Sequence, residues 1–210
     1  MSVYDISIHP DVNSCHHWYN DAMGRWVPDA QGRLIAAAMD LFSERGFEQT
    51  SVAEIAKRAG LTERTFFRYF SDKREVLFFG SENLERAMLE ALNQAPKTLA
   101  PIEAVGVALE SVGEFFRDIR PHSRRRQAII DANPELQERE RKKLAGIAVS
   151  LGAALQQRGM SELPATLVAE IGVAVFKTAF ERWLNDSQDR DYAYHVHESL
   201  NELKSVTSGH

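Results

Sequence analysis

Six basic side chains gather in one short stretch of the sequence and could bind phosphate groups. Between residues 57 and 74 they outnumber the acidic Glu63 and Asp72 by four: Lys57, Arg58, Arg64, Arg68, Lys73 and Arg74. Lysine and arginine are the side chains that neutralise nucleic-acid phosphates. The net charge of −5 for the whole chain argues against such a partner, but a local patch counts for more than the total. Charge alone leaves two alternatives open, a DNA-binding surface and a solvated helix face.

Residues that could carry catalysis or hold a metal are not arranged for either. A helical enzyme with a di-iron centre needs Glu-x-x-His pairs on facing helices, and the sequence has none. His195 and His197 are two residues apart, so they lie on different faces of a helix. A glycine-rich phosphate loop and a Gly-x-Ser-x-Gly motif are also missing. We therefore predict no enzyme, no catalytic residue, no metal site and no cofactor.

The composition is that of a soluble protein with a core, at 44% hydrophobic and 26% charged residues. The longest nearly apolar runs, 34–39 and 146–155, are shorter than the roughly 18 residues that a membrane span needs. The first residues lack the basic start and apolar middle of a secretion signal. Cys15 is the single cysteine and suits a reducing compartment. We expect a cytoplasmic protein with no membrane partner.

The elements that must position the basic patch are predicted to be helices. Apolar residues recur at spacings of three and four nearly throughout, and no run alternates as a strand does. The first helix is expected at about 28–45, ending at Gly46. Thr50 or Ser51 can cap the second, with Glu54 in capping-box spacing to Ser51, and Gly60 ends it. Thr62 can cap a third helix over 63–70, and Ser71 can cap a fourth that continues through Leu92.

The second half of the chain predicts five further helices after a linker at 95–101. One apolar stripe runs from Ile102 to Ile119, a short helix covers 122–131, and Pro134 opens a long one whose end is marked by Gly159 and Pro164. The helix at about 163–184 is apolar on more than one side, so other helices are expected to pack against it on two sides. The last helix is expected at about 191–206, with a single apolar stripe.

Residues 33–73 fit a helix-turn-helix. The turn Gly60-Leu61-Thr62 follows a short helix in which Ala56 and Ala59 permit close approach of the next helix. The leading side chains of that next helix can then enter a major groove. A plain helical hairpin is the alternative.

The same residues carry a resemblance. The strings 36–47 (AAAMDLFSERGF), 50–62 (TSVAEIAKRAGLT) and 65–73 (TFFRYFSDK) resemble the tetracycline-repressor (TetR) family over about a quarter of the chain. The resemblance implies an all-α protein with an N-terminal three-helix, helix-turn-helix DNA-binding domain and a C-terminal helical ligand-binding and dimerisation domain. The domains are predicted as an extension at 1–27, the DNA-binding domain at 28–74 and the second domain at 75–210. Within the extension, Arg25 could enter a minor groove as an arm, or the segment is disordered or packs on itself.

The resemblance implies which side chains meet double-stranded operator DNA. Its third helix is the reader, which places Arg64 at base edges, where a guanidinium can take O6 and N7 of guanine; a phosphate contact is the alternative. Phe67 could touch a thymine methyl group. Tyr69 and Lys73 match positions that grip phosphate, and Phe66 and Phe70 are expected in the core. The full predicted DNA-binding set is Thr50, Ser51, Thr62, Glu63, Arg64, Thr65, Phe67, Arg68, Tyr69 and Lys73.

The resemblance also implies a homodimer and a small-molecule effector. Two reader helices at a fixed separation select a palindromic operator, and a ligand that favours another separation weakens DNA binding. A repressor released by its ligand is therefore expected. The alternatives are an activator of the same fold and a helical ligand-binding protein that does not bind DNA.

The ligand is expected in the C-terminal domain. Residues 124–139, beginning with three arginines, resemble a subgroup described as binding acyl-coenzyme-A-like ligands. The arginines could meet an anionic head group, or they point different ways and mostly meet water. The predicted ligand-binding set consists of apolar residues and one histidine, for which a place in the core is the alternative: Met88, Phe116, His122, Leu151, Phe176 and Phe180.

Overall fold

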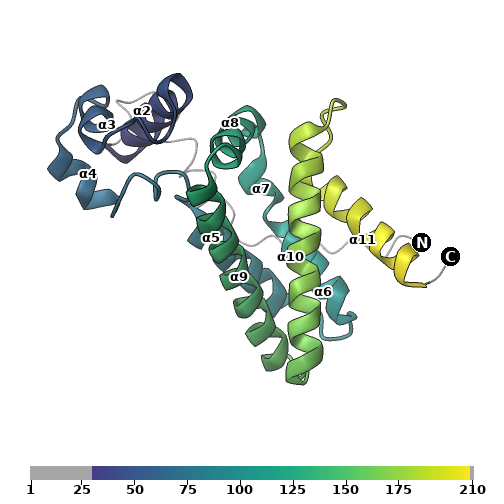
Figure 1. Ribbon diagram of the computed structural model, residues 1–210. Helices are drawn as coiled ribbons and strands as arrows, with labels where there is room; N and C mark the ends of the chain where they lie inside the picture. The colour runs from purple at the N-terminus through teal and green to yellow at the C-terminus, as the bar shows by residue number, and fades with distance from the viewer. Residues whose placement is uncertain (1–29, 209–210) are drawn as a thin grey trace.

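The computed structural model describes residues 30–208, and within this range all regular structure is helical. Figure 1 shows two parts, a small group of α2, α3 and α4 and a bundle of longer helices. The predicted all-α class is confirmed. The extension at 1–27, Arg25 within it, Cys15 and the expected helix start at residue 28 lie outside the described residues. The helices are α2 (Ala30–Arg45), α3 (Val52–Arg58), α4 (Glu63–Tyr69), α5 (Ser81–Gln94), α6 (Pro101–Ser111), α7 (Gly113–Phe116), α8 (Arg120–Asp131), α9 (Pro134–Gln157), α10 (Glu162–Asn185) and α11 (Tyr192–Ser208).

The three N-terminal helices form where the sequence places caps and breakers. Ser51 and Glu54 make the capping box at the start of α3: the Glu54 backbone N–H donates to Ser51 Oγ at 3.2 Å, and the Ser51 N–H donates to Glu54 Oε2 at 2.9 Å. Gly46 follows α2 with φ of +87°, a backbone that a residue with a β-carbon rarely adopts. The inner faces of the helices meet in a core that includes Leu34, Leu41, Phe42, Ile55 and Phe66.

The prediction of a helix capped by Ser71 and continuous to Leu92 is wrong. Residues 71–80 form bends and turns, and α5 begins only at Ser81. Asp72 makes the local hydrogen bonds instead, because its Oδ1 accepts from the backbone N–H groups of Arg74 at 2.8 Å and Glu75 at 3.3 Å. Three consecutive apolar residues then turn into the N-terminal core: Val76, Leu77 and Phe78. A single helix could not bury three consecutive side chains on one side.

The predicted apolar stripe from Ile102 to Ile119 is divided between α6 and α7 and does not lie on one helix. The chain leaves α6 at Val112, and Ile119 directly precedes α8. Gly113 lies against α11, since a β-carbon placed there would be 3.7 Å from the Tyr192 ring. Asp118 has a left-handed backbone, with φ of +62°, so the chain changes direction before α8.

The C-terminal bundle is built around α10. This helix packs against α9 on one side and against α6 and α11 on the other, which confirms that it is covered on more than one side. A third side stays open: Leu163, Leu167 and Ile171 are 70%, 56% and 37% exposed. By length and composition α10 is the only described helix that could cross a membrane, a test that core helices of soluble proteins also pass.

The N-terminal core continues into the C-terminal bundle. Ile129 and Ile130 of α8 and Leu136 of α9 are buried together with residues of α2 and α4. Arginines reinforce this junction: Arg74 pairs with Glu135 at 2.5 Å, and Arg139 pairs with Glu75. The N-terminal helices therefore share a core with α8 and α9, and the turn that follows α4 is tied to α9 by ion pairs.

Candidate DNA-binding interface

The turn between α3 and α4 fixes the direction of the predicted reader helix. Gly60 has φ of +68°, and the Leu61 backbone N–H donates to the Ala56 carbonyl at 2.8 Å. Thr62 caps α4, because its Oγ1 accepts from the Thr65 N–H at 3.2 Å. The hydroxyls of Thr62 and Thr65 also lie 3.0 Å apart. The start of α4 is thus held by its own side chains and remains at the surface.

The leading side chains of α4 divide into an outward and an inward set. Glu63 and Arg64 are exposed, and Phe67 is 55% exposed although it is a large apolar side chain. Phe66 is fully buried and meets the Phe67 ring edge-on, with ring centroids 5.5 Å apart. Arg64 makes no ion pair or hydrogen bond with any described residue, so its guanidinium is available to a partner. This is the arrangement that a helix needs to present side chains to a groove.

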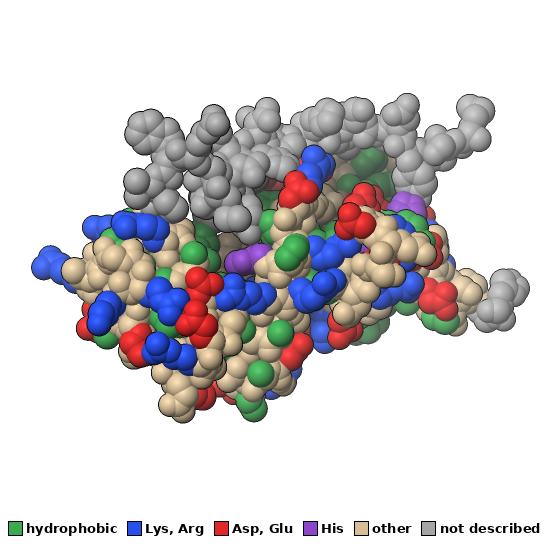
Figure 2. Space-filling model, turned by 90° about the horizontal axis from the view of Figure 1, so that it is seen from above, with side chains coloured by type: hydrophobic (Ala, Val, Ile, Leu, Met, Phe, Trp, Pro, Cys, Tyr) green, Lys and Arg blue, Asp and Glu red, His purple; other side chains and the backbone are tan. Residues whose placement is uncertain are grey.

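Ion pairs reduce the net charge of the basic patch. Arg58 binds Glu44 through both of its terminal nitrogens, at 3.1 and 2.8 Å, and this contact lowers the pKa of the Glu44 carboxyl. Arg74 is held by Asp72 and Glu135. Figure 2 shows Lys and Arg side chains, with acidic ones among them, at the end of the molecule that carries the N-terminal helices.

Arg68 and Tyr69 form a pair at the end of α4. The Arg68 guanidinium donates to the Tyr69 hydroxyl at 3.1 Å and lies over the Tyr69 ring, 4.9 Å from its centroid. Tyr69 keeps 38% of its surface exposed. Both side chains stay at the surface and next to each other, where a hydroxyl and a guanidinium can contact one phosphate.

The structure uses Lys73 to hold the loop before α3. Its ammonium group donates to the carbonyls of Phe47 at 2.8 Å, Thr50 at 3.0 Å and Glu48 at 3.3 Å. It also lies over the Phe47 ring, 4.3 Å from the centroid. Three carbonyls therefore already satisfy the three donors of this ammonium. Nothing in the sequence pattern pairs residue 73 with residues 47–50.

Thr50 and Ser51 also have internal roles. Thr50 is only 2% exposed, and its hydroxyl donates to the Gly46 carbonyl at 2.9 Å. Ser51 is exposed, and its hydroxyl donates to Glu54 at 2.8 Å in the capping box. The two hydroxyls are therefore committed to hydrogen bonds within the protein.

Two family matches cover most of the described chain. Residues 34–78 match the family described as "Bacterial regulatory proteins, tetR family", and residues 99–208 match the family described as "MftR C-terminal domain". The chain belongs to the TetR family. Members of this family are transcriptional regulators and not enzymes, so the chain is assigned as a transcriptional regulator.

Similar proteins support this assignment. The putative mycofactocin biosynthesis transcriptional regulator MftR of Mycobacterium tuberculosis is 29% identical over 174 residues, which is 80% of this chain and 86% of that protein. The regulator TcmR of Streptomyces glaucescens is 36% identical over 86 residues, and there the match covers only 41% of this chain and 38% of TcmR. Among solved structures, FadR from Bacillus subtilis in complex with stearoyl-CoA is similar with a TM-score of 0.50 and 21% identity, covering 82% of this chain and 95% of that one. That likeness shows a shared fold.

The residues predicted to bind a ligand lie mostly in one place. Phe116 of α7 meets Phe176 and Phe180 of α10, with ring centroids 6.5 and 5.2 Å apart. Trp183 and Tyr192, which sequence reasoning missed, join this aromatic cluster at 5.2 and 4.8 Å from Phe116. Aromatic residues at helical spacing are common in protein cores, so the sequence alone did not identify these two as members of a possible ligand site.

The other three predicted ligand residues are placed differently. Met88 and Leu151 are almost fully buried in the core of the same bundle. His122 lies on α8, outside that core cluster, and burial together with Arg126 and Arg125 lowers its pKa. The structure thus brings five of the six residues into one core and leaves His122 beside it.

The three consecutive arginines of α8 point different ways, and each binds the protein. Arg124 donates to the Leu184 carbonyl at 3.0 Å. Arg125 reaches α2, where it donates to the Met39 carbonyl at 2.8 Å and to Asp40 at 2.9 Å. Arg126 binds the Leu77 carbonyl and Glu140. Their guanidinium groups therefore join α8 to α2, to the turn before α5 and to α9 and α10, and they have fewer donors left for a head group or for water.

Proposed function

We propose that the chain is a dimeric repressor that reads a palindromic operator with α4 and is released by a small-molecule effector. The observation that carries the proposal is the exposed start of α4, where Glu63, Arg64 and Phe67 project from a capped helix end. Arg64 provides the base contact, because a guanidinium matches O6 and N7 of guanine. Thr65, Arg68 and Tyr69 contribute next to it. The backbone N–H groups at the starts of α3 and α4, which Thr50, Ser51 and Thr62 hold in place, set the register on the phosphates. Lys73 acts through the loop that it holds.

The open side of α10 supports the dimer. Leu163, Leu167 and Ile171 are four residues apart, so they form one apolar stripe along the helix. Such a stripe costs free energy in water and is stabilised when a second copy covers it. In this proposal α10 and α11 of each subunit form a four-helix interface at the side of the molecule away from α2–α4 (Figure 1).

The effector is proposed to enter the bundle at the aromatic cluster defined above, with Met88 and Leu151 behind it and His122 beside it. Phe116 lies on α7, a helix of four residues, and its ring contacts four other rings. Because these rings fill the space at the cluster, an apolar ligand that enters there must displace the Phe116 side chain. Movement of α7 would then reach α8, whose Arg125 binds α2. The FadR structure holds stearoyl-CoA, which supports an acyl-CoA as the first compound to try.

Selection of bound sequences from random duplex DNA tests the reader helix. We expect the wild-type chain to enrich a two-fold symmetric sequence and Arg64→Ala to lose the preference at one base pair in each half-site, typically by about 1 to 3 kcal/mol. Arg141→Ala is the matched control, because Arg141 is an exposed arginine of α9, outside the proposed reader helix. An Arg64→Ala profile identical to the wild-type profile would refute the assignment of α4 as the reader. If the chain binds no duplex at any salt concentration, the alternative of a ligand-binding protein without a DNA target is correct.

Light scattering tests the interface. Leu167→Glu places a charge in the apolar stripe and is expected to give a monomer. Val149→Glu makes the same kind of change at a side chain of α9 that is 74% exposed and lies outside the proposed interface, so it should stay dimeric. A Leu167→Glu variant with the wild-type mass in solution would contradict the proposal.

Release from the selected operator tests the effector. Palmitoyl-CoA is expected to lower DNA affinity of the wild-type chain, and Phe180→Ala should change the concentration at which it acts. Free coenzyme A is the control for the head group alone. Release by coenzyme A and palmitoyl-CoA at equal concentrations would exclude the apolar cluster as the site.

A further inference from the structure

Tyr192 has a hydroxyl group that the fold leaves without a hydrogen bond. The side chain is 1% exposed, and its hydroxyl oxygen has no partner among residues 30–208. Burial raises the pKa of this phenol well above its ordinary value, so the group keeps its proton and remains a donor. A buried donor without a partner destabilises the folded state, and phenylalanine would fill the same space without that penalty. The hydroxyl therefore indicates a role other than packing.

The ring of Tyr192 lies within the aromatic cluster that is proposed for the effector. Its centroid is 4.8 Å from that of Phe116 and 6.1 Å from that of Phe176. The Trp183 ring also meets it at a steep angle, with centroids 6.5 Å apart. Helix α7 covers this ring, since a β-carbon at Gly113 would be 3.7 Å from it. A ligand that displaces Phe116 therefore comes next to Tyr192.

Arg120 of α8 has a second buried donor beside the cluster. Its guanidinium lies over the Trp183 ring, 5.2 Å from the centroid, and its Nε atom is buried without a partner among the described residues. The terminal nitrogens are occupied, because they donate to Asp189 at 2.8 Å and to the Arg190 carbonyl. Asp189 thus balances the charge of Arg120. An arginine can only donate and a protonated phenol also donates, so a ligand oxygen that accepts satisfies either group.

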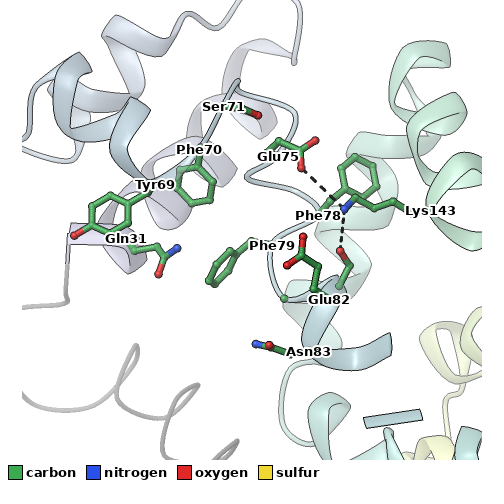
Figure 3. Close-up of a pocket in the computed structure, with 12 residues that line it drawn as sticks. Gln31, Tyr69, Phe70, Ser71, Glu75, Phe78, Phe79, Glu82, Asn83 and Lys143 are labelled. Carbon is green, nitrogen blue, oxygen red and sulfur yellow. Dashed lines mark hydrogen bonds and ion pairs between the residues drawn. The ribbon is translucent and has the colours of Figure 1, made fainter. Parts of the chain in front are cut away.

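The hollow between the end of α4, the start of α5 and α9 differs from this site. Lys143 there lies 4.0 Å from Glu75 and donates to the Ser81 hydroxyl at 3.1 Å (Figure 3). None of the described residues that line this hollow has a buried side-chain polar atom without a partner. Its polar groups therefore do not indicate one class of ligand, whereas the Tyr192 hydroxyl does.

We propose that the effector is an apolar compound with a neutral carbonyl group, whose oxygen accepts a hydrogen bond from the Tyr192 hydroxyl. A hydrocarbon would leave this hydroxyl unpaired. A carboxylate would be buried against aromatic rings, next to an arginine whose charge Asp189 already balances, and burial of an ion without a counter-ion is unfavourable. This inference rests on the proposed effector site and names the class of compound that the site takes.

Titration of the free full chain with propiophenone and propylbenzene, followed by ligand-observed NMR, tests the contact. The two compounds have the same carbon skeleton and differ only in the carbonyl group. Tyr192→Phe should weaken propiophenone binding about three- to tenfold, because it removes one hydrogen bond, and should leave propylbenzene binding unchanged. Tyr194→Phe is the matched control. Tyr194 is 39% exposed on the same helix, and its hydroxyl accepts from Arg190 at 3.1 Å, so this variant should bind both compounds as the wild type does.

Thermal melts without ligand separate this role from a structural one. Tyr192→Phe should raise Tm by about 2 to 4 °C, because it removes a buried donor that has no partner. Tyr194→Phe loses an existing hydrogen bond and should not raise Tm. A lower Tm in Tyr192→Phe than in the wild type would show that the hydroxyl already has a partner in the fold, and the proposal would be overturned.

The binding results distinguish this inference from the proposed site on which it rests. If neither compound binds, the cluster does not admit apolar ligands, and the proposed site fails together with the inference. If both bind and Tyr192→Phe changes both Kd values by the same factor, the site stands and the carbonyl contact is refuted. Tighter binding of 3-phenylpropanoate than of propiophenone would overturn the assignment of a neutral group.

Discussion

Replacing Lys73 by methionine separates two roles for this side chain. The family resemblance assigns it to a phosphate, whereas the structure shows its ammonium bound to three carbonyls of the loop 47–50 and stacked over Phe47. Methionine keeps the apolar stem and removes the charge and the donors. If the loop depends on this ammonium, Lys73→Met destabilises the fold before any DNA is added.

The size of the effect follows from the contacts. The carbonyl of Glu48 is at an exposed position and can turn to water, but the bonds to the Phe47 and Thr50 carbonyls are partly buried. A net loss of about 1 kcal/mol for each of these two bonds and about 0.5 to 1 kcal/mol for the ring contact gives about 2.5 to 3 kcal/mol. For a chain of this size that corresponds to a fall in Tm of about 5 to 12 °C.

Differential scanning calorimetry of the free protein measures this directly. Lys57→Met is the control, because Lys57 is an exposed lysine of α3 that binds no described residue, and its Tm should match the wild type within about 2 °C. Operator affinity measured against salt gives the second readout. A Lys73→Met variant with the wild-type Tm and a salt dependence lower by about one phosphate contact would refute the structural role and restore the phosphate contact.

Two further predictions concern packing and pH. Gly172→Ala should lower the free energy of unfolding, measured by urea titration, by about 1 to 3 kcal/mol, because the new β-carbon would lie 2.7 Å from Val105 Cγ1. Gly146→Ala is the control and should be neutral or stabilising, because its β-carbon meets nothing within 4 Å. Equal losses of stability in both variants would contradict the packing argument. Burial lowers the pKa of His195 despite Asp186 at 3.7 Å, so the unfolded chain takes up a proton more readily; stability should be complete above the unfolded pKa of about 6.5 and fall below it by at most about 1.4 kcal/mol per pH unit for this group. His195→Gln should show a shallower fall between pH 7 and 5, and parallel curves would show that folding does not change the pKa of His195.

The sequence predicted what depends on local patterns. Ser51, Gly60 and Thr62 act within a few residues of themselves, so the bounds of α3 and α4 follow from short-range rules for caps and breakers. The double coverage of α10 was likewise visible as apolar residues on several sides. The exposed Arg64 and the buried Phe66 follow from their places on one short helix.

The remaining features depend on contacts between distant residues. Lys73 binds carbonyls more than 20 residues away, and Arg125 reaches α2 across more than 80, which no periodicity reveals. The sequence did not predict that Phe78 lies in a turn and not in a helix, because its burial depends on Ile130 of α8 and Leu136 of α9, which are distant in the sequence. Helical propensity favoured a continuous helix from Ser71, and tertiary packing overrode it.

Scrambling one half of the selected operator tests the central claim, that two copies of α4 read two half-sites together. Each half-site should supply a large share of the specific binding free energy, so the intact duplex should bind at least about thirtyfold more tightly than the half-scrambled one, with two chains per duplex and the half-site centres one helical turn apart. Equal affinity for both duplexes, or one chain bound per intact operator, would contradict the account.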